Sequence, residues 1–403
     1  MTKDDDPLML HYARELSSRV ETPFYFFDIE GIRQRIRDFA AVWRAHFPGA
    51  ILAYSYKTNP IAAITTIFRK EGGRAEVVSE KELLWALADG YPGSQIHFNG
   101  PAKSTEALRR AMEADAAIHI DSLDELDLIF KLQVDCRPRI VLRASHLLAS
   151  GERSRFGLLP DECHLALDRL ENTGLSADGI HFHLGSNINS TAKYMQSISD
   201  NAPLLDRLLA QAPAGRKVSL DIGGGFPSRS ASDVKIIPID TFAKDTLRTL
   251  RNHNINPTDL TMIVEPGRCL VEEAALLATR VMARKTRAGR HLVFVDAGLD
   301  LVRSAGAMHH RVWFESERFE QHHTPYEVCG ARCYEADRMP TAAVGPQDVK
   351  IGSMVFISSA GAYALVQAGV WNGLCARIYG VDGSKVFELG RDGRLPELIS
   401  TPS

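Results

Sequence analysis

Cysteine is scarce in this sequence, where six residues are scattered over 403 positions. So few cysteines in so long a chain do not suggest a disulfide framework. Long apolar runs are also missing, and no stretch of about 18 uninterrupted apolar residues could span a bilayer. The first residues are acidic (Asp4, Asp5, Asp6) and show no apolar core followed by a cleavage site, so we find no secretory signal. These absences favour a cytoplasmic protein without a membrane partner.

The sequence also lacks an excess of either charge. Lysine and arginine number 47 against 50 aspartates and glutamates, which gives a net charge of -3. This balance offers no general electrostatic reason to bind nucleic acid or an anionic membrane. The length exceeds one ordinary domain and suits a large domain with a smaller one.

Short apolar runs alternate with amphipathic stretches up to about residue 268. The amphipathic stretches include 79–88, 104–113, 122–132 and 191–209. This alternation predicts βαβ units and a parallel sheet, and eight units over roughly 220 residues fit an α/β fold of the (β/α)₈ TIM-barrel type. An open doubly wound sheet is the alternative, because a count of strands does not show closure. The predicted strands are 51–56, 75–78, 95–98, 117–120, 139–143, 179–182, 218–222 and 262–265.

The pattern changes after Arg268, where β-type runs dominate and helical stretches are few. The longer runs lie at 276–283, 291–295, 349–357 and 385–388, and they predict a second, mainly antiparallel β domain. The early apolar run 22–27 could pair into that domain. We therefore predict a barrel domain over 29–268 and a β domain made of 1–28 and 269–403.

Polar or glycine residues follow nearly every predicted barrel strand. Active sites of such barrels form at the carboxyl ends of the strands, so these residues are candidates for one shared site. They are Lys57, Ser79, Asn99, Asp121, His146, His183, the glycines 223–225 and residues 265–268.

The most informative segment is 54–60, Tyr-Ser-Tyr-Lys-Thr-Asn-Pro, in which Lys57 stands at the mouth of an apolar strand. Burial there can depress the pKa of the lysine and make its amine nucleophilic. A surface lysine at a strand end is the alternative.

Two further strand ends carry groups suited to a phosphorylated aromatic cofactor. Gly223, Gly224 and Gly225 let the backbone approach an anion and point its N–H groups at phosphate. Glu265 could hold a pyridine nitrogen protonated, and Arg268 could add charge to a phosphate site. Packing of the glycines and an internal salt bridge of Glu265 are the alternatives.

A metal site must be weighed at His181 and His183, which point the same way on a strand. Divalent metals usually want a third or fourth protein ligand, and none is obvious in the sequence. Cys329 and Cys333 lack a second cysteine pair. A ring stacking on a cofactor, or a hydrogen-bonded core histidine, fits better, so we predict no metal.

Taken together, these segments resemble the fold-type III pyridoxal 5′-phosphate (PLP) decarboxylases, the group of diaminopimelate, ornithine and biosynthetic arginine decarboxylases. The resemblance runs from about residue 22 to residue 372 and keeps the family's order of motifs. It also covers 76–83, 99–104, 121–126 and the Arg-Phe-Gly of 155–157. It implies an alanine-racemase-like fold, a PLP cofactor and a small amino-acid substrate that loses carbon dioxide.

The resemblance also implies a role for each residue of the cofactor site. Lys57 would hold the cofactor covalently, His183 would stack on its ring, and Glu265 would pair with the ring nitrogen. The phosphate would be bound by Ser186, Gly223, Gly224, Gly225, Gly267, Arg268 and Tyr363.

Residues 330–333, Gly-Ala-Arg-Cys, resemble the family's cysteine motif, which the partner subunit contributes to the active site. Cys333 would then protonate the substrate carbon after decarboxylation, whereas a buried structural cysteine is the alternative. Asp337 lies near the family's acidic position. The resemblance therefore implies a head-to-tail homodimer with two shared active sites.

The match breaks where substrate specificity would be set. Tyr334 follows the cysteine, where family members place an acidic residue, and Glu335 comes one position later. The segment 301–311 lacks the Arg-Pro…Tyr pattern expected for diaminopimelate and is basic, with Arg303 and His309 among its residues. Such charge suits a substrate with extra carboxylates, and a solvated basic turn is the alternative.

We therefore predict PLP-dependent decarboxylation of a non-standard or carboxylate-rich amino acid, in a siderophore-like or other secondary-metabolite pathway. The predicted substrate-binding residues are Arg303, His309, Tyr334, Glu335 and Asp337.

Other functions fit parts of the sequence. A diaminopimelate- or ornithine-type decarboxylase would share the cofactor residues. A racemase of this architecture usually places an arginine at the ring nitrogen, so Glu265 and Cys333 favour decarboxylation. A non-catalytic PLP-binding regulatory relative could dispense with Lys57, Glu265 and Cys333, yet all three are present. In a barrel enzyme without a cofactor, Lys57, the glycines and Glu265 would have no shared function.

Overall fold

Eight parallel strands close into a barrel in the computed structural model, which describes residues 7–132, 134–228, 235–306, 308, 310–315, 324–339, 343–369 and 376–389. The barrel closes where the first of these strands pairs with the last, with Ile51 opposite Ile263. The strands are almost wholly buried because helices cover them outside and side chains fill the interior. They are β2 (Ile51–Ser55), β3 (Arg74–Val77), β4 (Ile96–Phe98), β5 (Ala117–Ile120), β6 (Arg139–Arg143), β7 (Gly179–His181), β8 (Val218–Asp221) and β9 (Leu260–Val264).

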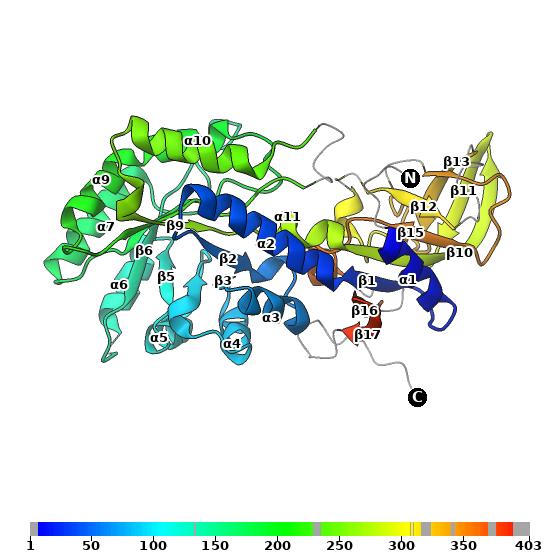
Figure 1. Cartoon of the computed structure of the whole chain (residues 1–403), viewed down its shortest axis with the longest axis horizontal. Helices are drawn as coiled ribbons and strands as arrows, with labels where there is room; N and C mark the ends of the chain where they lie inside the picture. The colour runs from blue at the N-terminus through cyan, green and yellow to red at the C-terminus, as the bar shows by residue number, and fades with distance from the viewer. Residues whose placement is uncertain are drawn as a thin grey trace.

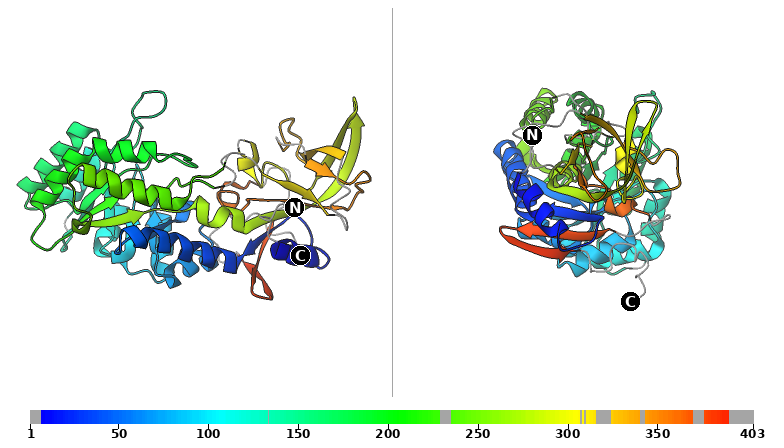
Figure 2. Two further views of the ribbon diagram at one scale, coloured as in Figure 1. Left: turned by 45° about the horizontal axis from the view of Figure 1, so that its top comes forward. Right: turned by 90° about the vertical axis from the view of Figure 1, so that its right-hand side faces the viewer.

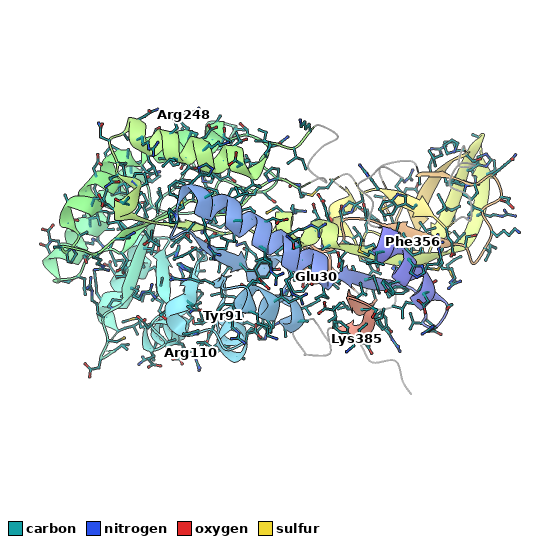
Figure 3. The ribbon with its side chains drawn as sticks, viewed as in Figure 1. Glu30, Tyr91, Arg110, Arg248, Phe356 and Lys385 are labelled. Carbon is teal, nitrogen blue, oxygen red and sulfur yellow. The ribbon has the colours of Figure 1, made fainter. Side chains whose placement is uncertain are left out.

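The helices between the strands form the outer layer of the barrel (Figure 1). Serine hydroxyls cap the amino ends of three of them; for example, Ser79 Oγ accepts a hydrogen bond from Glu82 N at 3.2 Å. Charged residues such as Arg110 and Arg248 lie on the outer faces (Figure 3). The helices are α2 (Ile29–His46), α3 (Ala62–Lys70), α4 (Glu80–Ala88), α5 (Thr105–Glu113), α6 (Leu123–Lys131), α7 (Pro160–Asn172), α8 (Ala192–Asp200), α9 (Ala202–Gln211) and α10 (Ile239–Asn252).

The amphipathic stretch predicted at 191–209 is two helices rather than one. The helix is interrupted at Asn201, between α8 and α9, and Pro203 follows in the first turn of α9. Proline is tolerated in a first turn because it lacks the N–H that a helix interior needs.

A second sheet lies beside the barrel and gives the molecule an elongated shape (Figures 1 and 2). Its main order is β14-β13-β11-β10-β1-β16-β17, and β12 and β15 pair alongside. Most pairs are antiparallel, but β1 runs parallel to β16 and β11 runs parallel to β13. The strands are β1 (Phe24–Asp28), β10 (Ala275–Arg287), β11 (Arg290–Val295), β12 (Val312–Phe314), β13 (Thr324–Gly330), β14 (Ala343–Gly345), β15 (Met354–Ile357), β16 (Arg377–Asp382) and β17 (Lys385–Leu389).

The predicted fold class is confirmed, because a closed parallel barrel stands beside a mostly antiparallel sheet. The early run does join the second sheet, where β1 pairs with β10 and β16. The boundaries at 28 and 268 themselves remain a prediction. No helix in the described part of the chain is long and apolar enough to cross a membrane.

Strand β1 connects the two cores because its side chains alternate between its faces. Tyr25 and Phe27 belong to the large core that includes the barrel. Phe24 and Phe26 belong to a smaller core under α1 (Pro7–Ser17). Every one of these four rings is buried, so β1 holds the sheet against the barrel through one face.

Asp28 ends β1 and caps α2, and this cap supplies a test of the connection. Its Oδ1 accepts a hydrogen bond from Gly31 N at 2.9 Å. Replacement Asp28→Ala leaves that N–H without its acceptor and should lower the free energy of unfolding by about 1 kcal/mol. Asp28→Asn should stay within a few tenths of a kcal/mol of the original protein. Urea unfolding followed by circular dichroism measures both, and equal midpoints for Asp28→Ala and the original protein would contradict the assignment.

Candidate active site

The carboxyl ends of the barrel strands gather the cofactor-site residues predicted from the sequence. Lys57 lies in a short 3₁₀ turn, η1 (Tyr56–Thr58), directly after β2. Its Nζ lies 2.6 Å from Glu76 Oε2, on the neighbouring strand β3. Asn99 Nδ2 bridges two acids, donating to Glu76 Oε1 at 3.1 Å and to Glu265 Oε1 at 2.7 Å. A lysine, an amide and two buried acids therefore form one continuous polar group.

The expectation that burial depresses the pKa of Lys57 is wrong for the chain by itself. Burial does lower this pKa, but the negative charges of Glu76 and Glu265 more than offset it, so the pKa lies above its usual range. Lys57 is therefore an ammonium ion paired with Glu76. For Lys57 to act as a nucleophile, its proton must first leave, and Glu76 is the nearest group that could take it.

Glu265 lies just beyond β9, and the neighbouring cations and rings favour its ionised form. Its Oε2 is 3.6 Å from His181 Nε2 and 3.8 Å from His183 Nδ1. Burial raises the pKa of Glu265, but His181, Lys57 and His183 lower it by more than burial raises it. The pKa therefore lies well below its usual range. Glu265 is therefore a buried carboxylate.

His183 is a neutral ring at the edge of this group. Burial and the positive charge of Lys57 lower the pKa of His183 to about 3. Its Nδ1 accepts a hydrogen bond from Gly224 N at 3.2 Å. The imidazole is thus fixed between the glycine loop and Glu265.

The glycines 223–225 bring the backbone closer to its neighbours than any side chain would allow. Gly223 and Gly225 adopt left-handed φ angles of +68° and +88°, which glycine reaches without strain. A Cβ atom on Gly224 would collide with the carbonyl oxygen of Glu265. The backbone of the loop therefore lies directly against the backbone of Glu265.

Three more predicted residues lie together at the carboxyl end of the barrel, namely Arg268, Ser186 and Tyr363. Arg268 Nε donates to Ser186 Oγ at 3.3 Å, and its guanidinium lies 4.8 Å from the centre of the Tyr363 ring. Tyr363 N donates to Thr58 O at 2.9 Å, next to Lys57. A Cβ atom on Gly267 would collide with the hydroxyl of Thr58. These contacts bring the segment around Tyr363 onto the Lys57 turn.

Sequence reasoning missed Glu76 as a functional residue, and it listed Asn99 as a strand end and as part of a resembling segment without giving it a role. Glu76 is 1% exposed and also accepts a hydrogen bond from Ser55 Oγ. Its signals were an acid inside an apolar run and its place in the resembling segment 76–83, and neither assigned it a role. Glu272 was missed as well, and it forms a buried ion pair with Arg268.

The cysteine segment is open to solvent in the single chain. Cys333 and Tyr334 are exposed, and Glu335 pairs with Arg338 at 2.6 Å on the surface. Asp337 differs, because it is buried and its carboxylate accepts hydrogen bonds from Leu299 N at 2.7 Å and Arg332 N at 3.1 Å. These contacts favour a role for Asp337 in holding the loop rather than in contacting substrate.

The segment around residue 303 lies close to the barrel mouth. Arg303 begins a short 3₁₀ turn, η6 (Arg303–Gly306), and is exposed. Asn187 Nδ2 donates to Met308 Sδ at 3.9 Å, and Asn187 follows Ser186 in the chain. His310 is buried and contacts Ser358 O at 2.7 Å. His309 lies outside the described residues.

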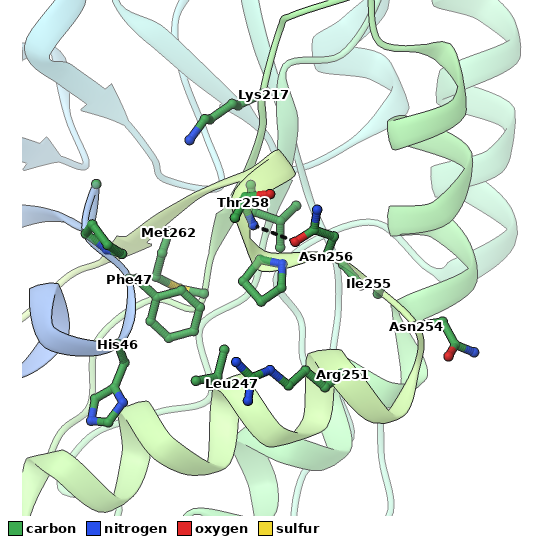
Figure 4. A pocket seen from close by; sticks show the side chains of 14 residues that line it. His46, Phe47, Lys217, Leu247, Arg251, Asn254, Ile255, Asn256, Thr258 and Met262 are labelled. Atoms are coloured by element: carbon green, nitrogen blue, oxygen red, sulfur yellow. Dashed lines mark hydrogen bonds between the residues drawn. The ribbon is translucent and has the colours of Figure 1, made fainter.

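A cavity of about 540 Å³ occurs at the other end of the barrel, where β9 begins (Figure 4). Its lining includes Phe47, Leu247, Arg251 and Met262. None of the predicted site residues that the structure describes lines it. Because barrel enzymes carry out their chemistry at the carboxyl ends of the strands, the candidate active site is the Lys57 group.

The donor set at the barrel mouth fits PLP. The site offers a lysine for an aldehyde, a buried carboxylate for a ring nitrogen, and a glycine turn with an arginine for a phosphate. Only glycine fits at position 224, because a Cβ atom there would collide with the backbone of Glu265. Fold and site together define an enzyme of the alanine-racemase-like architecture, built around a phosphorylated aldehyde cofactor.

Comparisons with known proteins agree with this definition. The family model of the pyridoxal-binding domain of pyridoxal-dependent decarboxylases matches residues 33–272. The diaminopimelate decarboxylase of Deinococcus radiodurans is 30% identical over 88% of this chain and 89% of its own length. The lysine/ornithine decarboxylase of Selenomonas ruminantium is 28% identical over 90% of each. The chain therefore belongs to the pyridoxal-dependent decarboxylase family, and it is a PLP-dependent carboxy-lyase.

A solved structure shows the same fold. Diaminopimelate decarboxylase from Helicobacter pylori complexed with L-lysine matches with a TM-score of 0.81 and 24% identity, over 93% of this chain and 95% of that one. The relatives reported above are named diaminopimelate and lysine/ornithine decarboxylases, and these names do not indicate a siderophore branch.

The Lys57–Glu76 pair yields a test at the site. Glu76→Gln removes the charge that raises the pKa of Lys57, so that pKa should fall and the amine should become reactive at lower pH. The pH profile of PLP uptake by the apo-protein should therefore shift to lower pH. Turnover should drop by about 10²-fold because proton transfer loses its acceptor.

Glu80→Gln is the control, since Glu80 pairs with Arg110 on the surface. Absorbance after PLP addition over a pH series measures uptake, and steady-state kinetics measure turnover. An unchanged pH profile in Glu76→Gln would refute the assignment of Glu76 as the partner that controls Lys57.

Proposed function

We propose that this enzyme decarboxylates an amino acid whose far end carries a second charged group, with diaminopimelate as the first candidate. The observation that carries the proposal is the pairing of Lys57 with Glu76, which Asn99 joins to Glu265 beside the glycine loop. The names of the curated relatives support diaminopimelate over a siderophore intermediate.

The chain's own residues divide the work of the reaction. PLP, when bound, accepts the electron pair left on the substrate α-carbon after carbon dioxide departs. Glu265 would balance positive charge on the ring nitrogen, and His183 would contribute a neutral ring face. Lys57 would hold the cofactor and release it to the substrate amine, and Glu76 would take the proton of Lys57 and return it.

The phosphate of the cofactor would be held by the glycine loop together with side chains that already contact one another. Arg268 supplies positive charge, and its own geometry is fixed by Ser186 and the buried Glu272. Tyr363 packs against the guanidinium of Arg268, and Gly267 packs against Thr58.

The proton that replaces the carboxylate would come from Cys333 of a second copy of the chain. Its exposure in the single chain supports this assignment, because a partner could then insert the segment. The protein would thus be a homodimer with shared sites, and its place would be the cytoplasm. Tyr334 and Glu335, which are also exposed, would line the same interface.

Arg303 is our candidate for reading the far end of the substrate. Its guanidinium is exposed on η6, and the contact between Met308 and Asn187 ties the segment to the loop after Ser186. A guanidinium binds a carboxylate through charge-assisted hydrogen bonds. His309 and Asp337 remain members of the proposed substrate site, although the buried contacts of Asp337 make it the weaker member.

A carboxylate-rich amino acid of a siderophore-like or other secondary-metabolite pathway is the second candidate. One observation favours it: Tyr334 stands directly after Cys333, where the resembling family has an acid for a distal amine. Both candidates share a distal carboxylate, so Arg303 serves either of them.

A panel of amino acids tests the proposal. The holoenzyme should release carbon dioxide from diaminopimelate, or from a more carboxylate-rich amino acid, faster than from ornithine, lysine or arginine. Arg303→Ala should raise KM for the preferred substrate about tenfold or more, since a charge-assisted hydrogen bond is worth roughly 1.5–3 kcal/mol. Carbon dioxide release and mass spectrometry of the products provide the readouts.

Arg290→Ala is the control for a general loss of charge, because Arg290 pairs with Glu327 on the sheet domain. Fastest turnover of ornithine, with no effect of Arg303→Ala, would contradict the proposed substrate class. Loss of optical rotation without release of carbon dioxide would instead show a racemase.

A further inference from the structure

The barrel interior beneath Glu265 holds an unusual concentration of buried polar side chains. Asp221 at the end of β8, His181 at the end of β7 and His119 in β5 are each at most 1% exposed. Their potential ligand atoms and those of Glu265 all lie within 4.8 Å of one another. Burying such groups costs free energy unless each finds a partner. The cluster therefore needs a physical explanation.

Several atoms of this cluster have no hydrogen-bond partner among the described residues. Asp221 Oδ1 accepts from Gly223 N at 2.9 Å, but its Oδ2 accepts from no donor. Both ring nitrogens of His181 and Nδ1 of His119 are likewise without a hydrogen bond. Asp221 Oδ2 thus lies in a buried space with another carboxyl group beside it and no donor to satisfy it.

Two carboxylates cannot both stay charged in so buried a place. Burial and the neighbouring charge of Glu265 raise the pKa of Asp221 well above its usual range. Glu265 goes the other way, because His181 and Lys57 outweigh its burial and lower its pKa. The pair therefore carries one proton, and that proton resides on Asp221.

We propose that Asp221 is a positioning residue that the barrel interior keeps as the neutral acid, and that its Oδ2 hydroxyl donates a hydrogen bond to Glu265 while its Oδ1 accepts from Gly223. One side chain then connects the acid for the ring nitrogen to the loop for the phosphate. The inference rests on the proposed roles of Glu265 and the glycines in holding PLP.

A divalent cation is the competing occupant of the same four residues, since they offer two imidazoles and two carboxylates. A cation would draw on Glu265 and reduce the negative charge available to a ring nitrogen. Asp221 Oδ1 is already engaged by Gly223 N, and His119 Nε2 lies 3.3 Å from His97 Nδ1. A proton on Oδ2 satisfies that atom and leaves the charge of Glu265 in place.

Two substitutions at position 221 should behave differently. In Asp221→Asn the side-chain oxygen can still accept from Gly223 N, and the amide N–H₂ can donate to Glu265. In Asp221→Leu both hydrogen bonds are lost, and Glu265 loses a donor that favours its ionised form. Asparagine should therefore preserve the function of Asp221, whereas leucine should not.

The experiment measures PLP binding first, because that readout needs no substrate. Asp221→Asn should keep the dissociation constant of PLP and kcat within about threefold, whereas Asp221→Leu should weaken PLP binding about tenfold or more and lower kcat with little change in KM. Infrared difference spectra should show the carbonyl stretch of a protonated carboxyl in the original protein and lose it in Asp221→Asn. Circular dichroism checks the folding of each variant.

Three outcomes would overturn the inference. Equal damage from Asp221→Asn and Asp221→Leu would mean that an ionised aspartate is required. A stoichiometric divalent metal in the purified holoenzyme, lost from Asp221→Asn, would assign the cluster to a cation. Unchanged PLP binding in folded Asp221→Leu would remove any positioning role. If Asp221→Leu does not fold, Asp221→Ala is measured in its place. The infrared band of the original protein and the PLP affinity of Asp221→Asn then decide whether the neutral acid is present.

A wrong assignment of the substrate would give a different experimental result. In that case no member of the amino-acid panel would release carbon dioxide, yet the contrast between Asp221→Asn and Asp221→Leu in PLP binding would persist.

Discussion

The structure depends on a balance of charge at the mouth of the barrel, where one lysine faces two buried acids. Lys57 contacts Glu76 directly, and Asn99 joins Glu76 to Glu265. A buried carboxylate is costly alone, but here each acid has a cation or a donor within reach. The ammonium of Lys57 and the carboxylate of Glu265 are therefore the ionic forms that the protein keeps before any substrate arrives. A carbonyl cofactor bound between them would meet an amine at one end and a negative charge at the other.

The rest of the fold holds this balance in place. Four barrel strands supply its residues: β2 leads into Lys57, β3 carries Glu76, β4 leads into Asn99 and β9 leads into Glu265. The second sheet contributes from outside, because the Tyr363 segment bonds to the backbone of Thr58 beside the lysine. Strand β1 packs one face into the barrel core and the other under α1, which fixes the sheet against that mouth. A shift between barrel and sheet would separate Tyr363 from Arg268.

The sequence alone predicted the barrel well, because buried parallel strands are continuous apolar runs that end in polar residues. Each predicted strand overlaps an observed one, and Lys57, His183, Gly224 and Glu265 do meet at one mouth. The sign of the Lys57 pKa shift could not be predicted, since it depends on Glu76, an acid from another strand. The buried cluster of Asp221, His119 and His181 was also out of reach, because only closure of the barrel brings those strands together. The role proposed for Cys333 was suggested only by a motif, and it would involve a second copy of the chain.

The most direct test of this account is the site at which the cofactor attaches. The holoenzyme is reduced with borohydride, digested and mapped by mass spectrometry. The account predicts a pyridoxyl group on the peptide that contains Lys57, and none on Lys103, a buried lysine whose Nζ lies 2.6 Å from Glu125. An unmodified Lys57 in protein loaded with PLP, or a pyridoxyl group on another lysine, would contradict it.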